Sequence, residues 1–499
     1  MKILNEKILN YLKKQKKKLV LCHGVFDLVH IGHIEHFSEA KQNGDILIVS
    51  VTSDKYVNKG PGRPFFSIDK RLKYLSSFKN VDYVIESKSK TAINLINFIK
   101  PDVYFKGPDY KNFDEDITGN IRKETNSVKK NKGRIVFSNA DTYSSSKILN
   151  KIDNVHQFNI LRKIKKNFSK LKIEEFFKEL SKLKIMVIGE TILDEYVYCD
   201  ALGKAGKEPI LTYNKNSTET YLGGSLATAQ NISDFVKKVY LISALGQKKE
   251  SEKLILKQLN SNIIKNFIYK KDSPTIIKTK IFDQLNNNKI LGFYEFNDKL
   301  LDIKQEKQLL TKIQKTSNKV DAIIISDYGH GLISKSLVSK IKKLKNTFVV
   351  NTQINSANLG YHTISKFYGY NYAIINEVEL RHELRDRSSK IQDLIKLLSK
   401  KLNILNLIVT AGKQGSYLYN KNLNKLIFCP ALAVKIVDKV GAGDAMLSFF
   451  SLATALNKNN PEFALFLGSL AAAKNIETQA NKHSIKKGDL LKSCYYFLK

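Results

Sequence analysis

The stretch "GVFDLVHIGHIEHF", residues 24–37, joins an apolar strand pattern to a helical pattern through a turn that carries two histidines. His30 and His33 are three residues apart, so both lie on one face of the first helical turn if the helix begins near His30. A helix N-terminus offers free N–H groups and a partial positive charge to an anion. Imidazoles at that place can bind phosphate oxygens and protonate as negative charge develops on them. The stretch therefore predicts a phosphate-handling site at a strand-to-helix turn.

Strand and helix patterns alternate on both sides of this turn, along residues 18–150, which predicts a parallel, doubly wound α/β domain. Residues 151–182 are lysine-rich with a helical pattern, and we interpret them as a connector. Residues 183–499 form a second, larger α/β region in which most strand patterns end in Gly, Asp or Asn before a helix. Because ligands of open α/β sheets bind at the carboxyl ends of strands, we expect the chemistry at these positions.

The composition allows several kinds of partner. The 499 residues include 83 basic and 47 acidic ones, and the net charge of +36 fits nucleotides, sugar phosphates or RNA, or a surplus spread over solvated surfaces. The longest apolar run, "ALFLGSLAAA", is shorter than the roughly 18 residues of a membrane span, and we expect neither a span nor a secretory signal. The four cysteines lie far apart, which predicts reduced thiols, no zinc site and a cytoplasmic location.

Four motifs in order resemble those of the HxGH, cytidylyltransferase-like nucleotidyltransferases. They are "GVFDLVHIGH", "NKGPGRPFFSIDKRLKYL", "PDVYFKGPDYK", where Pro108 replaces a glycine, and "TYSSSKIL". The resemblance implies a Rossmann-like fold and the attack of a sugar 1-phosphate on the α-phosphate of ATP or CTP. It implies catalytic roles for His30, His33, Lys59 and Arg71. It implies nucleotide contacts from Gly24, Phe26, Asp27, Lys106, Asp109, Ser144, Ser145 and Ser146.

The nucleophile of such a reaction is already an anion, so the site needs no general base. It must supply positive charge around the α-phosphate and the departing pyrophosphate. An alternative to the catalytic role of Arg71 is that it is a solvated charge on a helix surface. A similar alternative holds for Lys59 in its Gly- and Pro-rich loop.

A second chemical pattern is "DKVGAGDAM", residues 438–446. Gly441, Ala442 and Gly443 at a helix start offer N–H groups to a phosphoryl group in transfer. Asp444 beside them can accept the proton of an attacking hydroxyl, which, unlike a phosphate, needs a base. The alternative is that Asp444 only caps the helix. As a dinucleotide fingerprint the pattern is weak, because Met446 stands where the third glycine would be.

The second region resembles the ribokinase/PfkB sugar kinases. The motifs that carry this resemblance are "GETILDEYV", "YLGGSLATAQNI", "ISDYGHG", "NEVE", "VTAGKQG" and "VDKVGAGDA". The resemblance implies that Asp444 is the base, with an anion hole from the N–H groups of residues 441–443. It implies that Asn376 and Glu379 organise Mg²⁺ and phosphates, Glu379 acting on the metal indirectly. It implies that Thr410, Gly412 and Gly415 lie along ATP, and that the sugar is faced by Asp194, Gly223, Gly224, Asn231 and Asp327.

Together the two regions resemble the bifunctional heptose-7-phosphate kinases and heptose-1-phosphate nucleotidyltransferases, with the domain order reversed. The chain departs from the kinase pattern at Ala227, His330, Lys439 and the segment "VVNTQ", so a different sugar stays open. We expect sugar phosphates and nucleoside triphosphates as partners, no nucleic acid, and a homodimer through the kinase region as an open possibility.

Two other readings remain. "HIGH" followed by "SSSK" resembles class I aminoacyl-tRNA synthetases, but the first domain is too short for that catalytic core plus an anticodon module, and the kinase motifs would have no role. Alternatively, only the nucleotidyltransferase is active, and the kinase-like region is a regulatory or binding module.

Overall fold

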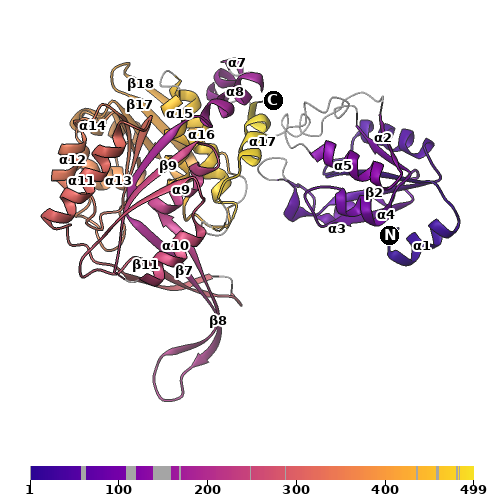
Figure 1. The fold of residues 1–499 in the computed structure, drawn as a ribbon, viewed down its shortest axis with the longest axis horizontal. Helices are drawn as coiled ribbons and strands as arrows, with labels where there is room; N and C mark the ends of the chain where they lie inside the picture. Colours follow the sequence, from indigo (N-terminus) through magenta and orange to yellow (C-terminus); the bar gives the residue numbers. More distant parts are fainter. Residues whose placement is uncertain are drawn as a thin grey trace. The chain divides into compact units, whose positions relative to one another are not determined.

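The computed structural model describes residues 2–57, 63–107, 120–138, 159–167, 170–247, 249–286, 288–433, 436–456, 460–478, 482 and 484–498 (Figure 1). The chain divides into two compact units. The first consists of Met1–Gln157 together with Leu491–Lys499, and the second consists of Phe158–Leu490. In the described residues no helix is both long and apolar enough to cross a membrane. All four cysteines are free and buried.

The first unit contains a five-stranded parallel sheet in the order β3-β2-β1-β4-β5, as the alternating sequence pattern predicts. Its strands are β1 (Leu19–Gly24), β2 (Ile46–Thr52), β3 (Tyr83–Ser87), β4 (Val103–Lys106) and β5 (Arg134–Phe137). The chain winds outward from β1 in both directions, so the strand order reverses between β1 and β4. A crevice at the carboxyl ends of these two strands is where such a sheet binds its ligand.

Helices cover both faces of this sheet, and the residues of β1 alternate between them. Val20 and Cys22 pack with residues of α2 and α3, whereas Leu19 and Leu21 pack with residues of α1 and α4. Burial on both faces explains why β1 is an apolar run without polar alternation. The helices are α1 (Glu6–Lys14), α2 (Ile31–Gln42), α3 (Ile68–Leu75), α4 (Ile93–Ile99) and α5 (Asn120–Lys130).

The second unit is built on a nine-stranded sheet in the order β10-β9-β6-β13-β14-β15-β16-β17-β18. The strands from β10 to β16 are parallel, and β17 and β18 add an antiparallel edge. Their bounds are β6 (Lys184–Gly189), β9 (Lys238–Leu245), β10 (Ile263–Tyr269), β13 (Ala322–Asp327), β14 (Thr347–Thr352), β15 (Tyr372–Asn376), β16 (Asn406–Thr410), β17 (Gly415–Asn420) and β18 (Lys425–Pro430).

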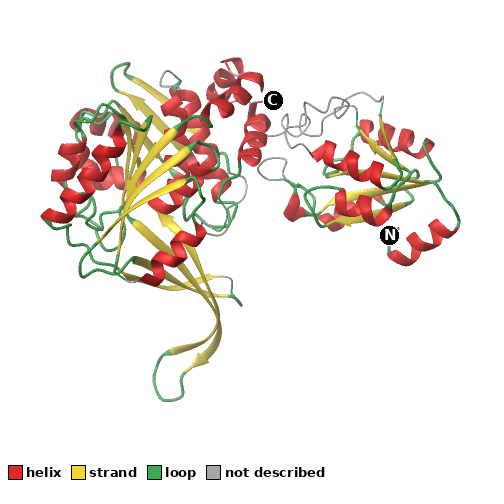
Figure 2. Cartoon of the chain, viewed as in Figure 1, coloured by secondary structure: helices red, strands yellow, loops and turns green. Residues whose placement is uncertain are grey.

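Helices lie on both sides of this large sheet, with α11–α14 on one side and α9, α15 and α16 on the other (Figures 1 and 2). The helices of this unit are α7 (Asn159–Asn167), α8 (Lys170–Leu180), α9 (Ser225–Ser233), α10 (Lys249–Gln258), α11 (Ile303–Ser317), α12 (Lys335–Ile341), α13 (Glu377–Leu384), α14 (Ile391–Lys401), α15 (Ala442–Leu456) and α16 (Pro461–Asn475). The last helix of the chain is α17 (Lys487–Leu498). The lysine-rich segment that we interpret as a connector contains α7 and α8.

A separate small sheet of four strands, in the order β12-β11-β7-β8, was not predicted from the sequence. Its strands are β7 (Thr191–Lys204), β8 (Leu211–Gly224), β11 (Ile276–Asp283) and β12 (Asn288–Glu295). The hairpin of β7 and β8 projects away from the body of the unit (Figure 1). Because β7 follows β6 almost directly and β8 ends where α9 begins, the roots of this sheet lie at one end of the large sheet.

Candidate active sites

The two histidines of the first unit lie together at the start of α2. His30 is the N-cap residue in extended conformation, and α2 begins at Ile31, which makes His33 the third residue of the helix. The backbone N–H of His30 donates to Nδ1 of His33 at 3.4 Å, and the two ring centroids are 4.0 Å apart. The two imidazoles therefore share one helix N-terminus, as the three-residue spacing predicts.

The loop between β1 and α2 is shaped around the ring of Phe26. Phe26 has a positive φ of 47°, and its ring packs edge-on against His33, with 5.5 Å between ring centroids. A Cβ atom at Gly24 would come within 3.0 Å of that ring. Glycine at position 24 thus leaves room for the aromatic support beneath His33.

Asp27, for which the resemblance implies a nucleotide contact, binds the protein itself. Its buried carboxylate accepts hydrogen bonds from Arg63 Nη1 at 2.8 Å and from the backbone N–H groups of Phe65 and Phe66 at 2.8 and 2.9 Å. In this geometry Asp27 holds residues 63–66 against the histidine turn.

Arg71 is not a solvated surface charge, because its side chain is completely buried. Nη1 donates to the carbonyl of Val25 at 2.6 Å, and Nη2 donates to the carbonyl of Thr52 at 2.9 Å and to Asp54 at 2.5 Å. Nε donates to the carbonyl of Phe66 at 2.9 Å. The guanidinium thereby ties together the loops that follow β1 and β2.

This arrangement makes Arg71 a stability determinant of the first unit. Arg71→Met is expected to lower the free energy of unfolding by about 2–5 kcal/mol, because it leaves buried carbonyl groups without donors. The measurement is urea unfolding of the full chain followed by circular dichroism. Lys73→Met, at an exposed position of the same helix, is the matched control. Equal unfolding midpoints for the two variants would contradict the structural role.

Lys106 ends β4, next to β1, and is buried. Its ammonium lies 3.2 Å from Glu124, which also accepts from the hydroxyl of Tyr104 and the backbone N–H of Ala92. Burial by itself would raise the pKa of Glu124, but Lys106 and these hydrogen bonds bring it below its usual value. Five predicted residues lie outside the described ones: Lys59, Asp109, Ser144, Ser145 and Ser146.

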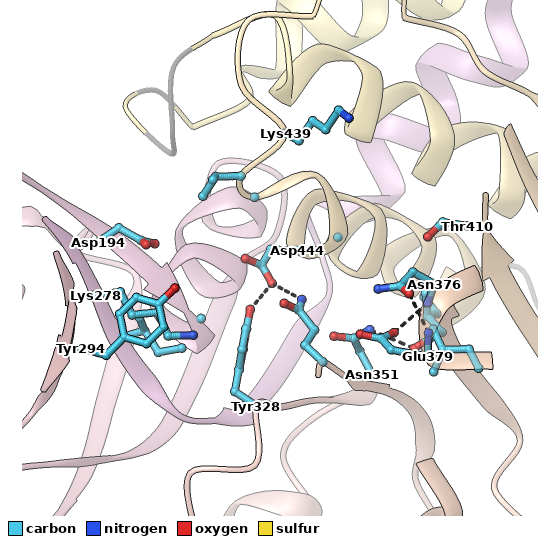
Figure 3. Close-up of a pocket in the computed structure, with 18 of the residues that line it drawn as sticks. Asp194, Lys278, Tyr294, Tyr328, Asn351, Asn376, Glu379, Thr410, Lys439 and Asp444 are labelled. Atoms are coloured by element: carbon cyan, nitrogen blue, oxygen red, sulfur yellow. Dashed lines mark hydrogen bonds between the residues drawn. The ribbon is translucent and has the colours of Figure 1, made fainter. Parts of the chain in front are cut away.

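The second unit contains a cavity of about 400 Å³ between the carboxyl ends of the large sheet and the small sheet. Asp444 occupies its middle in Figure 3, with Asp194, Lys278 and Tyr294 to one side and Asn376, Glu379 and Thr410 to the other. The predicted residues that line the cavity are Asp194, Gly224, Asn376, Glu379, Thr410, Gly441, Gly443 and Asp444.

Asp444 is the third residue of α15, so it is not the N-cap residue of that helix. Its Oδ1 accepts hydrogen bonds from the hydroxyl of Tyr328 and, at 3.3 Å, from Nε2 of Gln353 (Figure 3). Within the described chain Oδ2 has no donor. Burial, aided by the negative charge of Asp194, raises the pKa of Asp444 to about 7. A carboxylate with one anchored oxygen and one open oxygen is arranged to accept a proton from a ligand in the cavity.

The raised pKa predicts the pH dependence of any reaction that uses Asp444 as a base. Because the base must be deprotonated, the rate should fall as the pH decreases through about 7. Tyr328→Phe removes a hydrogen bond that stabilises the carboxylate, so the substitution should shift this fall in rate to higher pH. The measurement is kcat for sugar phosphorylation between about pH 5.5 and 8.5. A flat profile across this range would contradict the assignment.

Asn376 and Glu379 form a reciprocal cap at the start of α13. The backbone N–H of Glu379 donates to Asn376 at 2.9 Å, and the backbone N–H of Asn376 donates to Glu379 Oε2 at 2.7 Å. Oε1 of Glu379 accepts from the backbone N–H of Ile354, after β14, at 3.0 Å. Both carboxylate oxygens thus fasten backbone at the carboxyl ends of β14 and β15, and burial raises the pKa of Glu379 to about 7.

Thr410 ends β16, and the turn that follows it contains Gly412 and Gly415, with φ values of 54° and 120°. A Cβ atom at Gly415 would lie 2.2 Å from the carbonyl oxygen of Cys429. Glycine is therefore required at position 415 by the close approach of β18 as well as by the backbone conformation.

The opposite side of the cavity combines predicted and unexpected residues. Asp194 pairs with Lys280 at 2.8 Å, and a Cβ atom at Gly223 would lie 2.5 Å from the Asp194 carboxylate. Lys278 and Tyr294 come from the small sheet, and sequence reasoning missed both. The two-residue spacing of Lys278 and Lys280 in "IIKTKIFD" places them on one face of a strand. This spacing is the sequence signal from which a pair of lysines facing one site could have been predicted.

Two residues expected to face the sugar lie elsewhere in the structure. Asp327 is completely buried, forms an ion pair with Lys366 and accepts from the backbone N–H of Gly329 at 3.1 Å. Its neighbour Tyr328 lines the cavity instead. Asn231 lines a second cavity.

The residues at which the chain departs from the kinase motifs also lie in different places. Gln353, from "VVNTQ", and Lys439 line the cavity with Asp444, and Ala227 lines the second cavity. His330 is buried, and its Nδ1 lies 2.8 Å from Asp298. Some of the residues that distinguish this chain from the kinase pattern thus line the cavity that contains Asp444.

Curated relatives resemble a limited part of the chain. The bifunctional protein HldE of Campylobacter jejuni subsp. doylei is 44% identical over 108 residues, which are 21% of this chain and 23% of that protein. The bifunctional protein HldE of Helicobacter pylori is 38% identical over 153 residues, 30% of this chain and 31% of that protein. The matched stretches thus span less than a third of the length of these relatives.

Two solved structures share the fold of the second unit. Phosphofructokinase-2 from Escherichia coli, in complex with potassium, has a TM-score of 0.51 and 16% identity, covering 64% of this chain and 100% of that one. A ribokinase-like protein from Agrobacterium tumefaciens has a TM-score of 0.50 and 15% identity, covering 63% of this chain and 98% of that one.

Two protein families match the chain in separate regions. Residues 21–151 match the family described as cytidylyltransferase-like, in agreement with the motifs of the first unit. Residues 182–487 match the family described as pfkB family carbohydrate kinase. Because this second match spans more than half of the 499 residues, the chain belongs to the pfkB family of carbohydrate kinases.

Proposed function

We propose that the chain is a bifunctional enzyme of nucleotide-sugar biosynthesis. The second unit phosphorylates a sugar phosphate of the heptose-phosphate kind with ATP, and the first unit transfers a nucleotidyl group from ATP or CTP to a sugar 1-phosphate. The observation that carries the proposal is that each unit has its own phosphate-handling constellation at the start of a helix. One is the pair of imidazoles at α2, and the other is Asp444 beside Gly441 and Gly443 at α15.

In the phosphorylation, the acceptor hydroxyl gives its proton to Oδ2 of Asp444 while its oxygen attacks the γ-phosphorus of ATP. The bond between the γ-phosphorus and the bridging oxygen breaks, and ADP leaves. The N–H groups at the start of α15 stabilise the charge of the phosphoryl group in transfer. Tyr328 and Gln353 hold Oδ1, so that the lone pairs of Oδ2 remain directed into the cavity.

The acceptor is proposed to be anionic because of the cations near the sugar side. Lys278 and Lys280 come from β11, and Lys439 precedes the glycines of α15. Burial lowers the pKa of Lys278 from its usual value, although the carboxylates of Asp194 and Asp444 counteract this effect. A phosphate group on the acceptor would offset the cost of burying the Lys278 ammonium group on this side of the cavity.

In the nucleotidyl transfer, a phosphate oxygen of the sugar 1-phosphate attacks the α-phosphorus of the nucleotide, and the bond to the β-phosphate oxygen breaks to release pyrophosphate. His30 and His33 stabilise the charge on the α-phosphate, together with the N-terminus of α2. Asp27 and Arg71 act as positioning residues, since their bonds are to loops of the protein.

Both reactions are proposed to use Mg²⁺, which supplies charge neutralisation on the nucleotide's phosphates. The donor set of the second unit fits an ion held chiefly by phosphates and water, because both oxygens of Glu379 already accept backbone N–H groups. Exhaustive treatment with EDTA should abolish both activities, and added Mg²⁺ should restore them. Full turnover in a metal-free assay, measured for each reaction separately, would contradict this.

The experiment that tests the proposed function is a substrate screen of the full chain. A panel of sugar phosphates is incubated with ATP or CTP, and products are detected by mass spectrometry. We expect a bisphosphorylated sugar from the kinase and a nucleotide sugar from the transferase. Formation of only the nucleotide sugar, across the whole panel, would favour the alternative in which the kinase-like unit is a binding module.

A further inference from the structure

The second unit contains another cavity, of about 280 Å³, beside α9. It is called the α9 cavity below. Its wall is formed by Tyr221 and Leu222 at the end of β8, by residues of α9, and by Gln258, Lys482, Ser484 and Lys486. Among the described residues it shares no lining residue with the cavity that contains Asp444.

Asn231 is a largely buried polar residue in the wall of the α9 cavity. This residue is only 4% exposed, and its carboxamide has no hydrogen-bond partner in the described part of the chain. Ala227, one turn earlier on the same helix face, also lines the cavity. The polar atoms of the carboxamide are not fully buried, so they are free to bind the polar groups of a ligand that enters the cavity.

The rim of the α9 cavity carries two lysines whose partners are exposed. Lys482 lies 3.1 Å from Glu219, and Lys486 lies 2.7 Å from Asp234. The side chains of Lys482 and Lys486 are 42% and 58% exposed. Ion pairs of this kind are weak and readily exchange partners, so both ammonium groups are available to an anion.

We propose that the α9 cavity is a second ligand site, which binds a small phosphorylated polyol such as a sugar phosphate. The hydroxyl groups of the ligand bind the carboxamide of Asn231, and its phosphate binds Lys482 and Lys486 at the rim. The carboxamide suits hydroxyl groups because it offers both a donor and an acceptor. The net charge of +36 attracts such an anion to the protein from solution.

The test is a calorimetric titration of the full chain with ribose 5-phosphate, with inorganic phosphate and free ribose in parallel. Asn231→Leu and Lys482→Gln should each weaken the binding of ribose 5-phosphate at this site at least about tenfold. Lys425→Gln removes a lysine that is paired with Glu462 elsewhere in the unit, and it should bind like the wild type. Equal binding by the wild type, Asn231→Leu and Lys482→Gln would overturn the proposal, and so would the absence of binding to the wild type.

Two further readouts separate this site from other roles of Asn231. Because the polar atoms of Asn231 face the cavity and are not fully buried, Asn231→Leu should leave the melting temperature within about 2 °C of the wild type. A lower melting temperature would mean that the amide holds the fold together, and a raised KM for the phosphoryl acceptor would place Asn231 in the catalytic cavity. Equally tight binding of inorganic phosphate, insensitive to Asn231→Leu, would overturn the role of the amide.

Discussion

Asp444→Asn is expected to lower the rate of sugar phosphorylation by about 10²–10⁴-fold. The asparagine keeps the size of the side chain and can still bind Tyr328 and Gln353, but it has no carboxylate oxygen to accept a proton. The acceptor hydroxyl must then lose its proton to water, which is a weaker base than a carboxylate. The loss should appear in kcat, because the interaction with the proton strengthens only as the reaction proceeds.

The measurement is the steady-state formation of ADP with the sugar phosphate identified in the screen. Asp393→Asn is the matched control, since Asp393 also lies in the first turn of a helix, α14, but is exposed. A rate for Asp444→Asn within about twofold of the wild type, with the fold intact by circular dichroism, would show that Asp444 has a structural role only.

His33→Ala is expected to lower the rate of nucleotidyl transfer by about 10²–10³-fold, and His30→Ala should have a similar effect. The nucleophile, the α-phosphate and the leaving pyrophosphate are all anionic, so repulsion dominates the barrier. Two imidazoles whose centroids are 4.0 Å apart, at the N-terminus of α2, relieve that repulsion where it is greatest. The effect should again be on kcat, because charge builds up on the α-phosphate in the transition state.

His36→Gln is the matched control for the histidine variants. His36 lies on the same helix, and burial lowers its pKa to about 4, so it carries no charge at neutral pH. Pyrophosphate release with the cognate sugar 1-phosphate measures the rate. If His33→Ala lost no more activity than His36→Gln, the histidine pair would be part of the fold and not of the chemistry.

The backbone of both sites follows from local sequence patterns. The helix after β1 begins at Ile31 with His30 as its N-cap, and the helix of the "GAGD" motif begins at Ala442. Both starts agree with the spacing of polar and small residues in the sequence. Such features depend on neighbours within a few residues. They are therefore visible in a single sequence, and the family motifs strengthen them.

The side-chain environment of the sites could not be predicted from the same patterns. Tyr328 and Gln353 reach Asp444 from the ends of two other strands, and Lys278 reaches the cavity from the small sheet. These contacts join residues that are distant in sequence, and only the order of the strands brings them together. Sequence reasoning chose Asp327 for the sugar side, although the neighbouring tyrosine lines the cavity.

The burial of individual side chains could not be predicted from the sequence patterns either. Arg71 is charged and occurs in a helix with lysines, which is compatible with an exposed position, yet it is completely buried among backbone carbonyl groups. Asn231 follows the Gly-Gly motif closely in sequence, but it lies seven positions after Gly224, within α9, and lines another cavity. Successive side chains of a helix point in different directions, so two residues of one motif can face different cavities.

The central claim is that one chain contains two catalytic sites that work independently. The most direct measurement is to assay both reactions, side by side, in Asp444→Asn and in His33→Ala. We predict that Asp444→Asn loses sugar phosphorylation and retains nucleotidyl transfer, and that His33→Ala shows the opposite pattern. Loss of both activities from either single substitution, in a protein that remains folded, would contradict the account.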